Sequence, residues 1–299
     1  MTDTVRAIDD LRRRRRAAIL AHSYQPADIQ ALADFVGDSL ELSRAAASMD
    51  CETVVLCGVR FMAETAAVLA PDRTVLHPVP DAGCPLASCM DTSGLAALQN
   101  DHPGARTVVY VNSSIEAKAM SWACCTSANA TAVVSAAPSG EVVFGPDRNL
   151  GAFVASRTGK KLWIFDGGCP PHHSMDLSDV ARKRRLWPDA KLLVHPEAPP
   201  AAWAVADAVL GTGAMISFVR DSSASRFLIG TESGMVHRLR TLFPDREFEP
   251  VGSVSCPDMK KITPADVLAS LERMEPVTRI DPAVAEAARA SVARMASIG

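Results

Sequence analysis

The sequence predicts an α/β protein made of three similar α/β/α parallel-sheet domains around a pseudo-threefold axis, with its functional site at the centre. Three observations lead to this prediction. Cys84, Cys169 and Cys256 each precede a proline in a glycine-containing loop, and they are spaced 85 and 87 residues apart. Other landmarks repeat with nearly the same period. Short continuous apolar runs also alternate with helix-like segments, which is typical of parallel strands covered by helices.

The repeated landmarks fall where strands are expected to end. In each repeat the first apolar run ends in a histidine or tyrosine, the second is followed by a hydroxyl residue, and the third closes on glycine. These three sets are His22, Tyr110 and His195; Ser39, Ser127 and Thr212; and Gly58, Gly145 and Gly230. Because ligands bind beyond the carboxyl ends of parallel strands, we expect these positions to face one central site.

Each repeat contains four predicted strands. In the first, they are separated by a helix at 27–33, a helix opened by the GDS sequence, and a helix at 61–70 that ends before Pro71. The expected strands are 17–21, 34–36, 54–57 and 74–77; then 106–111, 122–125, 141–144 and 161–165; then 191–194, 206–210, 226–229 and 246–249.

Breaker-rich sequences divide the chain near residues 103 and 188, where DHPGA and WPDA occur. We therefore expect domains at 1–103, 104–188 and 189–299, with the Cys84, Cys169 and Cys256 loops respectively. The last of these includes an alanine-rich helix at 275–299 that has no counterpart in the other repeats.

Composition excludes several classes of protein. The chain has 299 residues, 48% of them apolar and 22% charged, and its net charge of −3 favours neither nucleic acid nor an anionic membrane. The basic run at 12–16 is expected to be the solvated face of a helix. No run approaches the roughly 18 apolar residues of a membrane span, and the N-terminus lacks the apolar core of a secretory signal. We expect a cytoplasmic protein, whose eight cysteines are thiols or metal ligands rather than disulfides.

The three repeated cysteines predict a metal centre. If the repeats surround an axis, the three thiols meet at one point, where thiolates bind metal. Three ligands on a four-iron cluster leave one iron open to act as a Lewis acid. Three buried structural cysteines are the plain alternative, and a zinc ion on these cysteines and His172 is another.

Acid–base chemistry is expected beside the thiols. His195 and Glu197 lie two residues apart at a strand end, so their side chains point to the same side, as proton transfer requires. Tyr24 is interpreted either as a packing residue or as a proton shuttle. Ser39, Ser127 and Thr212 are expected to cap helices, and a helix N-terminus also binds anions.

Several motifs resemble the quinolinate synthase family. They include HSYQ at 22–25, VGDSLELS at 36–43, AGCPLA at 82–87, YVNSSIEAKA at 110–119, GCPPH at 168–172, HPE at 195–197 and CPDMKKIT at 256–263. The resemblance runs along nearly the whole chain. It implies an oxygen-sensitive [4Fe–4S] cluster held by Cys84, Cys169 and Cys256. It also implies condensation of iminoaspartate with dihydroxyacetone phosphate to quinolinate, with release of phosphate and water, in de novo NAD biosynthesis.

The resemblance also implies roles for individual residues. Glu197 is expected to be a general base and His195 a substrate ligand, while His22 binds substrate or polarises a carbonyl. Tyr24 and Tyr110 complete the expected catalytic set. The expected substrate-binding residues are His22, Ser39, Tyr110, Val111, Asn112, Ser127, His172, His195, Pro196, Glu197 and Thr212. A transient partner, L-aspartate oxidase or aspartate dehydrogenase, would supply iminoaspartate.

Two alternatives stay open at this point: an iron–sulfur lyase or hydratase acting on another small acid, and a non-catalytic iron–sulfur or zinc sensor. The sequence departs from the family pattern at LGTGAM, where Gly211 and Gly213 stand beside Thr212, and at FDGGCPP before the second cysteine. Loops that bind carboxylates are where substrate choice would be tuned.

Overall fold

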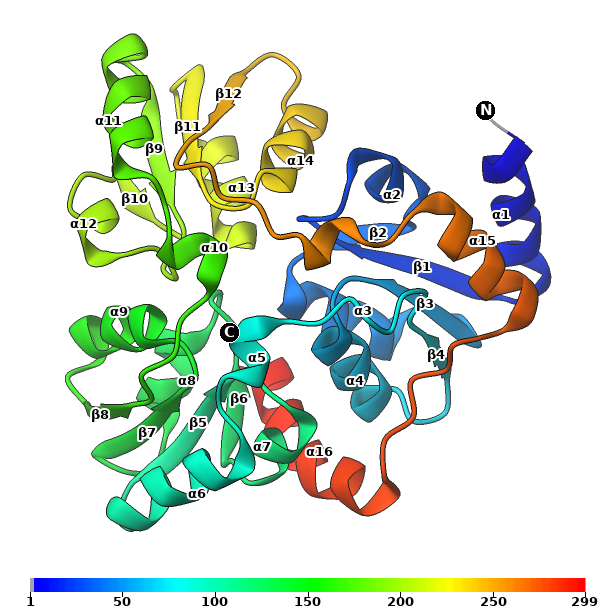
Figure 1. The fold of residues 1–299 in the computed structure, drawn as a ribbon, viewed down its shortest axis with the longest axis horizontal. Coiled ribbons are helices and arrows are strands. Elements are labelled where there is room, and N and C mark those ends of the chain that lie inside the picture. Colours follow the sequence, from blue (N-terminus) through cyan, green and yellow to red (C-terminus); the bar gives the residue numbers. More distant parts are fainter. Residues whose placement is uncertain (1–2, 299) are drawn as a thin grey trace.

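A computed structural model describes residues 3–298. It contains three separate four-stranded sheets, and every strand pair in each of them is parallel. The strand orders are β2-β1-β3-β4, β6-β5-β7-β8 and β10-β9-β11-β12. The same order in each third of the chain confirms the predicted internal repeat, and Figure 1 shows the three units around a common centre.

The strands form where the continuous apolar runs predicted them. Val54–Leu56 and Leu192–Val194, for example, are fully buried, as expected for strands covered on both faces. The strands are β1 Ala17–His22, β2 Phe35–Gly37, β3 Thr53–Cys57, β4 Thr74–Leu76, β5 Arg106–Tyr110, β6 Ala123–Cys125, β7 Glu141–Gly145, β8 Lys161–Ile164, β9 Lys191–Val194, β10 Ala208–Val209, β11 Arg226–Gly230 and β12 Glu247–Pro250.

Helices cover both faces of each sheet. Those of the first unit are α1 Asp3–Arg14, α2 Ala27–Leu32, α3 Ser39–Ser48 and α4 Arg60–Leu69, followed by α5 Pro85–Ser88 and α6 Thr92–Asp101. The second unit has α7 Ile115–Ala119, α8 Ala130–Ala136 and α9 Arg148–Thr158, followed by α10 Pro170–His173. Helix α11 Leu177–Leu186 comes next in the chain and packs on β11 of the third sheet. The third has α12 Pro200–Trp203, α13 Thr212–Asp221 and α14 Gly234–Leu242, then the 3₁₀ turn η1 Asp258–Lys260.

The last two helices leave the third unit. Helix α15, Pro264–Arg273, packs on α1, and α16, Pro282–Ser297, lies against α7 and β6 as well as α3 and α4 (Figure 1). The Asn129 side-chain amide donates to the carbonyl oxygens of Met295 and Ile298, at 2.9 and 2.7 Å, while Arg44 Nε donates to Ala296 O at 2.9 Å. The C-terminal helix therefore joins the first unit to the second.

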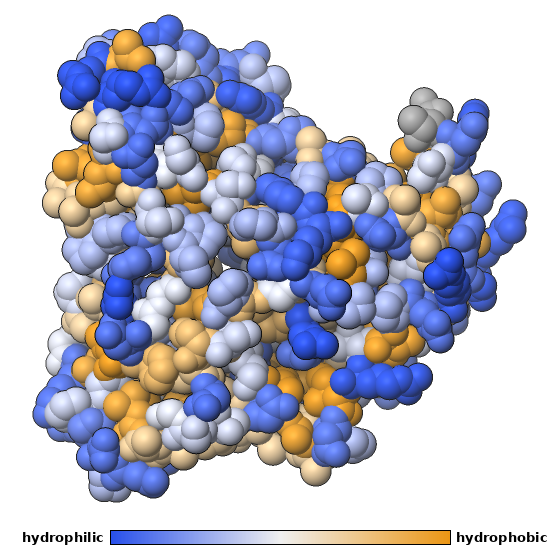
Figure 2. Space-filling view, viewed as in Figure 1, coloured by the Kyte–Doolittle hydropathy of each residue, from blue (hydrophilic) through white to orange (hydrophobic). Residues whose placement is uncertain are grey.

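Three apolar clusters form the core. The largest runs through the interfaces between the units, a second lies between the first sheet and helices α1 and α15, and a third lies within the third unit. On the face shown in Figure 2, apolar residues are mixed with hydrophilic ones. Within residues 3–298, no helix combines the length and apolar character needed to cross a membrane.

Candidate active site

The three units line one central cavity. It is lined from all three repeats by equivalent groups, which the sequence had placed at strand ends. These are His22, Tyr110 and His195; Ser39, Ser127 and Thr212; and Cys84, Cys169 and Cys256. Tyr24, Asn112, His172 and Glu197 line the same cavity. The carboxyl ends of three parallel sheets thus open into one space, in agreement with the general rule for α/β proteins.

Two residues of the expected set lie outside the lining. Val111 and Pro196 are buried beside the cavity, each next to a residue that lines it. The other five cysteines also lie elsewhere: Cys57, Cys124 and Cys125 are buried, Cys51 is half-buried and Cys89 is exposed.

The three hydroxyl residues are not the helix caps that the sequence predicted. Helix α3 is capped by Asp38, whose carboxylate accepts from the backbone N–H groups of Leu40 and Glu41, both at 2.9 Å. Ser39 is instead the first residue of α3. Thr212 likewise begins α13 after Gly211, and Ser127 lies two residues before the cap of α8. The hydroxyl groups of these three residues therefore do not cap the helices that follow them.

Glycines let the third unit approach the other two at these helix starts. A Cβ on Gly213 would lie 2.9 Å from a carboxylate oxygen of Asp38, which also accepts a hydrogen bond from the Gly213 N–H. A Cβ on Gly211 would lie 3.0 Å from Ser127 Oγ. Larger residues at Gly211 and Gly213 would push these loops apart.

The repeated thiols are free and near one another. None of the eight cysteines is in a disulfide, and Cys84 lies within electrostatic range of both Cys169 and Cys256. Burial raises the pKa of Cys84 to about 12 and raises the pKa of Cys169 and Cys256 as well. Thiols in such a setting become thiolates when a cation binds them. Three half-buried sulfurs facing one cavity thus fit a metal centre.

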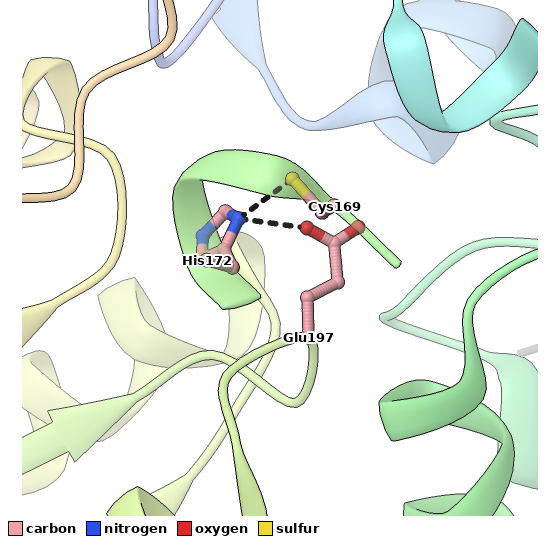
Figure 3. A group of neighbouring side chains, drawn as sticks. All are labelled: Cys169, His172 and Glu197. Carbon is pink, nitrogen blue, oxygen red and sulfur yellow. Dashed lines mark hydrogen bonds and ion pairs between the residues drawn. The ribbon is translucent and has the colours of Figure 1, made fainter. Parts of the chain in front are cut away.

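Glu197 is the centre of a buried hydrogen-bonded group (Figure 3). Its Oε2 lies 2.8 Å from His172 Nδ1 and 3.7 Å from His195 Nδ1. The same His172 nitrogen lies 3.2 Å from Cys169 Sγ. His195 Nε2 reaches Ser127 Oγ at 3.1 Å, so this group links a second-unit hydroxyl to third-unit acid–base residues.

Burial and charge set the protonation states. Burial lowers the pKa of His22 and of His195 to about 3, despite the opposing charge of Glu197, so both imidazoles are neutral near pH 7. Burial alone would raise the pKa of Glu197, but His172, His195 and hydrogen bonds from His172 and Tyr110 outweigh it and hold that pKa below its usual range. The cavity therefore contains an ionised carboxylate together with the neutral imidazoles of His22 and His195.

Thr231 extends this group to a tyrosine. Its Oγ1 lies 2.8 Å from His172 Nε2 and 2.7 Å from Tyr24 OH. A continuous chain of hydrogen bonds thus runs from Tyr24 through Thr231 and His172 to Glu197. Thr231 was not among the predicted site residues, although it directly follows Gly230, one of the repeated landmarks.

Two more acids near the cavity support the cysteine loops: Asp147, which the sequence did not single out, and Glu232, which was expected only as a strut between domains. Asp147 accepts from the backbone N–H of Cys169 at 3.1 Å, and Glu232 accepts from that of Cys256 at 3.3 Å. Each lies two residues after the glycine that closes the third strand of its unit. This repeated position is the sequence signal that would have indicated both acids. Burial and the charge of Glu197 raise the pKa of Asp147 to about 7. The equivalent position in the first unit is Arg60, so only two cysteine loops have this support.

Fold and site together define a three-repeat α/β enzyme whose central cavity combines three thiols with a buried acid–base group. The model of a protein family described as "Quinolinate synthetase A protein" matches residues 6–297. The chain is 47% identical over 289 residues to a quinolinate synthase of Dehalococcoides mccartyi (strain CBDB1), with 96% of each chain covered. It is 45% identical over 293 residues to that of Pelobacter propionicus, covering 97% of this chain and 96% of the relative. It is 43% identical over 297 residues to quinolinate synthase 1 of Methanosarcina acetivorans, covering 99% and 98%. The chain belongs to the quinolinate synthetase A family.

Proposed function

We propose that this protein is a quinolinate synthase that condenses iminoaspartate with dihydroxyacetone phosphate, releasing phosphate and water. The observation that carries the proposal is that one cavity gathers three free thiols, one from each repeat, beside a buried ionised glutamate, in a member of this family.

Cys84, Cys169 and Cys256 would hold a [4Fe–4S] cluster in this cavity. The donor set fits such a cluster, because the thiols are half-buried, free of disulfides and near one another, and they are the only cysteines of residues 3–298 in the lining. With one iron lacking a cysteine, the cluster would supply Lewis acidity to an oxygen of the substrate.

The protein's own residues would bind the substrates and move protons. Neutral His22 and His195 can hydrogen-bond a carbonyl or hydroxyl oxygen without adding charge. Ser39, Ser127 and Thr212, with Tyr110 and Asn112, would hold carboxylate and phosphate groups through hydroxyl and amide donors.

Glu197 would act as the general base. Its carboxylate accepts a proton at Oε2, and His172 Nδ1, 2.8 Å away, can receive it. The proton on His172 Nε2 can then pass to Thr231 Oγ1, whose own proton passes to Tyr24 OH, while Tyr24 gives its proton to the substrate in the cavity. Asn149 donates to the Glu197 carbonyl oxygen at 2.8 Å and so fixes the base from the neighbouring unit.

Several further expectations belong to the same proposal. The domains would be 1–103, 104–188 and 189–299, of which residues 1–2 and 299 lie outside the described part of the chain. The protein would work in the cytoplasm, in de novo NAD biosynthesis, and would receive iminoaspartate from L-aspartate oxidase or aspartate dehydrogenase.

The test is turnover by anaerobically purified protein reconstituted with iron and sulfide. Incubated with iminoaspartate and dihydroxyacetone phosphate, it should form quinolinate and hold about four irons per chain. Glu197→Gln should keep the iron and lose turnover, Cys84→Ser should lose both, and Glu286→Gln, an exposed α16 residue, should change neither. Absence of quinolinate from a cluster-replete sample rules the proposal out and leaves the lyase or hydratase. An output that survives Glu197→Gln points to a sensor.

A further inference from the structure

Three different donor atoms meet at one side of the cavity. Cys169 Sγ, His172 Nδ1 and a carboxylate oxygen of Glu197 all lie within 4.8 Å of one another. Cys169 caps the short helix α10, and His172 lies one turn later on it, so the sulfur and the imidazole nitrogen project together. Glu197 reaches them from the loop after β9, as Figure 3 shows.

The imidazole is oriented as a metal ligand would be. Its Nε2 is held by Thr231 Oγ1 at 2.8 Å, which leaves Nδ1 directed between the sulfur and the carboxylate. Such a bond to the distal nitrogen is the usual partner of a ligating histidine. The Glu197 backbone is also fixed, because its N–H donates to His195 Nδ1 and its carbonyl oxygen accepts from Asn149.

The donor types and spacing suit a single divalent ion. One thiolate, one imidazole and one carboxylate are the ligands that Zn²⁺ and Co²⁺ take in tetrahedral sites with one position open. Ordinary zinc–ligand bond lengths place such sulfur and nitrogen atoms about 3.6 Å apart, and nitrogen and oxygen about 3.4 Å apart. The present separations are 3.2 and 2.8 Å, so an ion needs these side chains to open by only about half an ångström.

We propose that the cluster-free protein binds one zinc-type divalent ion on Cys169, His172 and Glu197, and that this ion excludes the polynuclear centre. On binding, the Cys169 thiol releases its proton to solvent and the thiolate bonds to the ion. His172 takes the tautomer with its proton on Nε2, toward Thr231 Oγ1, and donates the Nδ1 lone pair to the ion, while Glu197 is already ionised. Cys169 cannot serve both centres, so a bound zinc ion blocks iron–sulfur loading. The exclusion rests on the proposed function, whereas the binding of the ion does not.

The test uses the full chain freed of metal and titrated anaerobically with Co²⁺, whose absorption bands report tetrahedral geometry and thiolate ligation. We expect one ion per chain with the charge-transfer intensity of a single thiolate, displaced by Zn²⁺. Cys169→Ser should abolish the charge-transfer band. His172→Gln and Glu197→Gln should weaken binding, and Thr231→Val, which removes the hydrogen bond to His172 Nε2 but no ligand of the ion, should weaken it about 10- to 100-fold.

Cys84→Ser and Cys256→Ser are the matched controls, because they remove a cluster ligand but no ligand of this site. Both should bind Co²⁺ like the unaltered chain. Loss of binding in either control, or a band with the intensity of three thiolates, would place the ion on the three cysteines and overturn the proposal.

Exclusion is measured by iron uptake. Protein loaded with one Zn²⁺ should take up little iron when supplied with iron and sulfide, and a chelator should restore uptake. Undiminished iron uptake by the zinc-loaded protein refutes the exclusion. A protein that binds cobalt as expected but makes no quinolinate would refute the proposed function and leave the divalent site standing.

Discussion

Replacing Lys260 with methionine should strongly destabilise the protein. The Lys260 ammonium lies 3.0 Å from Glu232, whose side chain is only 1% exposed, and it donates to the Tyr24 carbonyl oxygen at 2.5 Å. Lys260→Met leaves a buried carboxylate without its cation, a loss of about 3–5 kcal/mol when no water reaches the pair. Because Lys260 is 30% exposed and Glu232 keeps the Gly234 N–H, we expect a decrease of about 2–4 kcal/mol in the free energy of unfolding.

The adjacent lysine is the control. Lys261 also pairs with an acid, Asp258, but its side chain is 42% exposed, and such pairs contribute at most about 1 kcal/mol. Urea unfolding of metal-free protein, followed by circular dichroism, gives the midpoints of Lys260→Met and Lys261→Met. The midpoints report the difference in stability when both variants have the same dependence of unfolding free energy on urea concentration. Equal midpoints for the two variants would refute the view that the buried Glu232 depends on Lys260.

Three further outcomes are expected. A Cβ on Gly234 would lie 2.6 Å from the Tyr24 carbonyl oxygen, so Gly234→Ala should cost about 1–3 kcal/mol in urea unfolding, whereas Gly104→Ala, with open space around it, should not destabilise. Asn129→Asp loses both donors to the end of α16 and should cost about 2–3 kcal/mol, whereas Asn100→Asp on an exposed helix position should cost little. His22 takes up a proton below pH 6.5 in the unfolded chain but only near pH 3 in the folded chain, because burial lowers its pKa. The free energy of unfolding should therefore fall as the pH drops through this window. His22→Gln should reduce this pH dependence by up to about 1.4 kcal/mol per pH unit, measured by urea unfolding at a series of pH values.

The sheets were predictable because each buried strand is a continuous apolar run. The expected strand at 141–144 is β7, Glu141–Gly145, and the expected strand at 191–194 is β9. The strand order was not predicted, since neither one unit nor its repetition reveals how the strands pair within a sheet. The repeat indicated that the three units share one arrangement and that their strand ends meet at one site. Periodicity thus supplied the long-range information that local propensity lacks.

The caps and the last helices were not predictable in the same way. Asp38 and Ser39 are both good cap residues, and only the extended backbone of Asp38 makes it the cap of α3. The alanine-rich sequence at 275–299 predicted a helix, but nothing in its pattern indicates that α16 lies between the first and second units. That placement depends on contacts such as Asn129 with the end of α16, which pair residues more than 160 positions apart.

The repeat explains how three thiols reach one point, and the differences between repeats explain why the chemistry is concentrated at one of them. At the position after the glycine that closes the third strand, the chain has Val59, Pro146 and Thr231. Of these three side chains only that of the threonine can form hydrogen bonds, and its hydroxyl contacts both His172 Nε2 and Tyr24 OH. Equivalent positions in a repeated fold have similar surroundings, so a single polar residue distinguishes one face of the cavity from the other two. The proton path that we propose on the Glu197 side depends on this lack of symmetry, and Thr231→Val should slow proton transfer while leaving the three thiols in place.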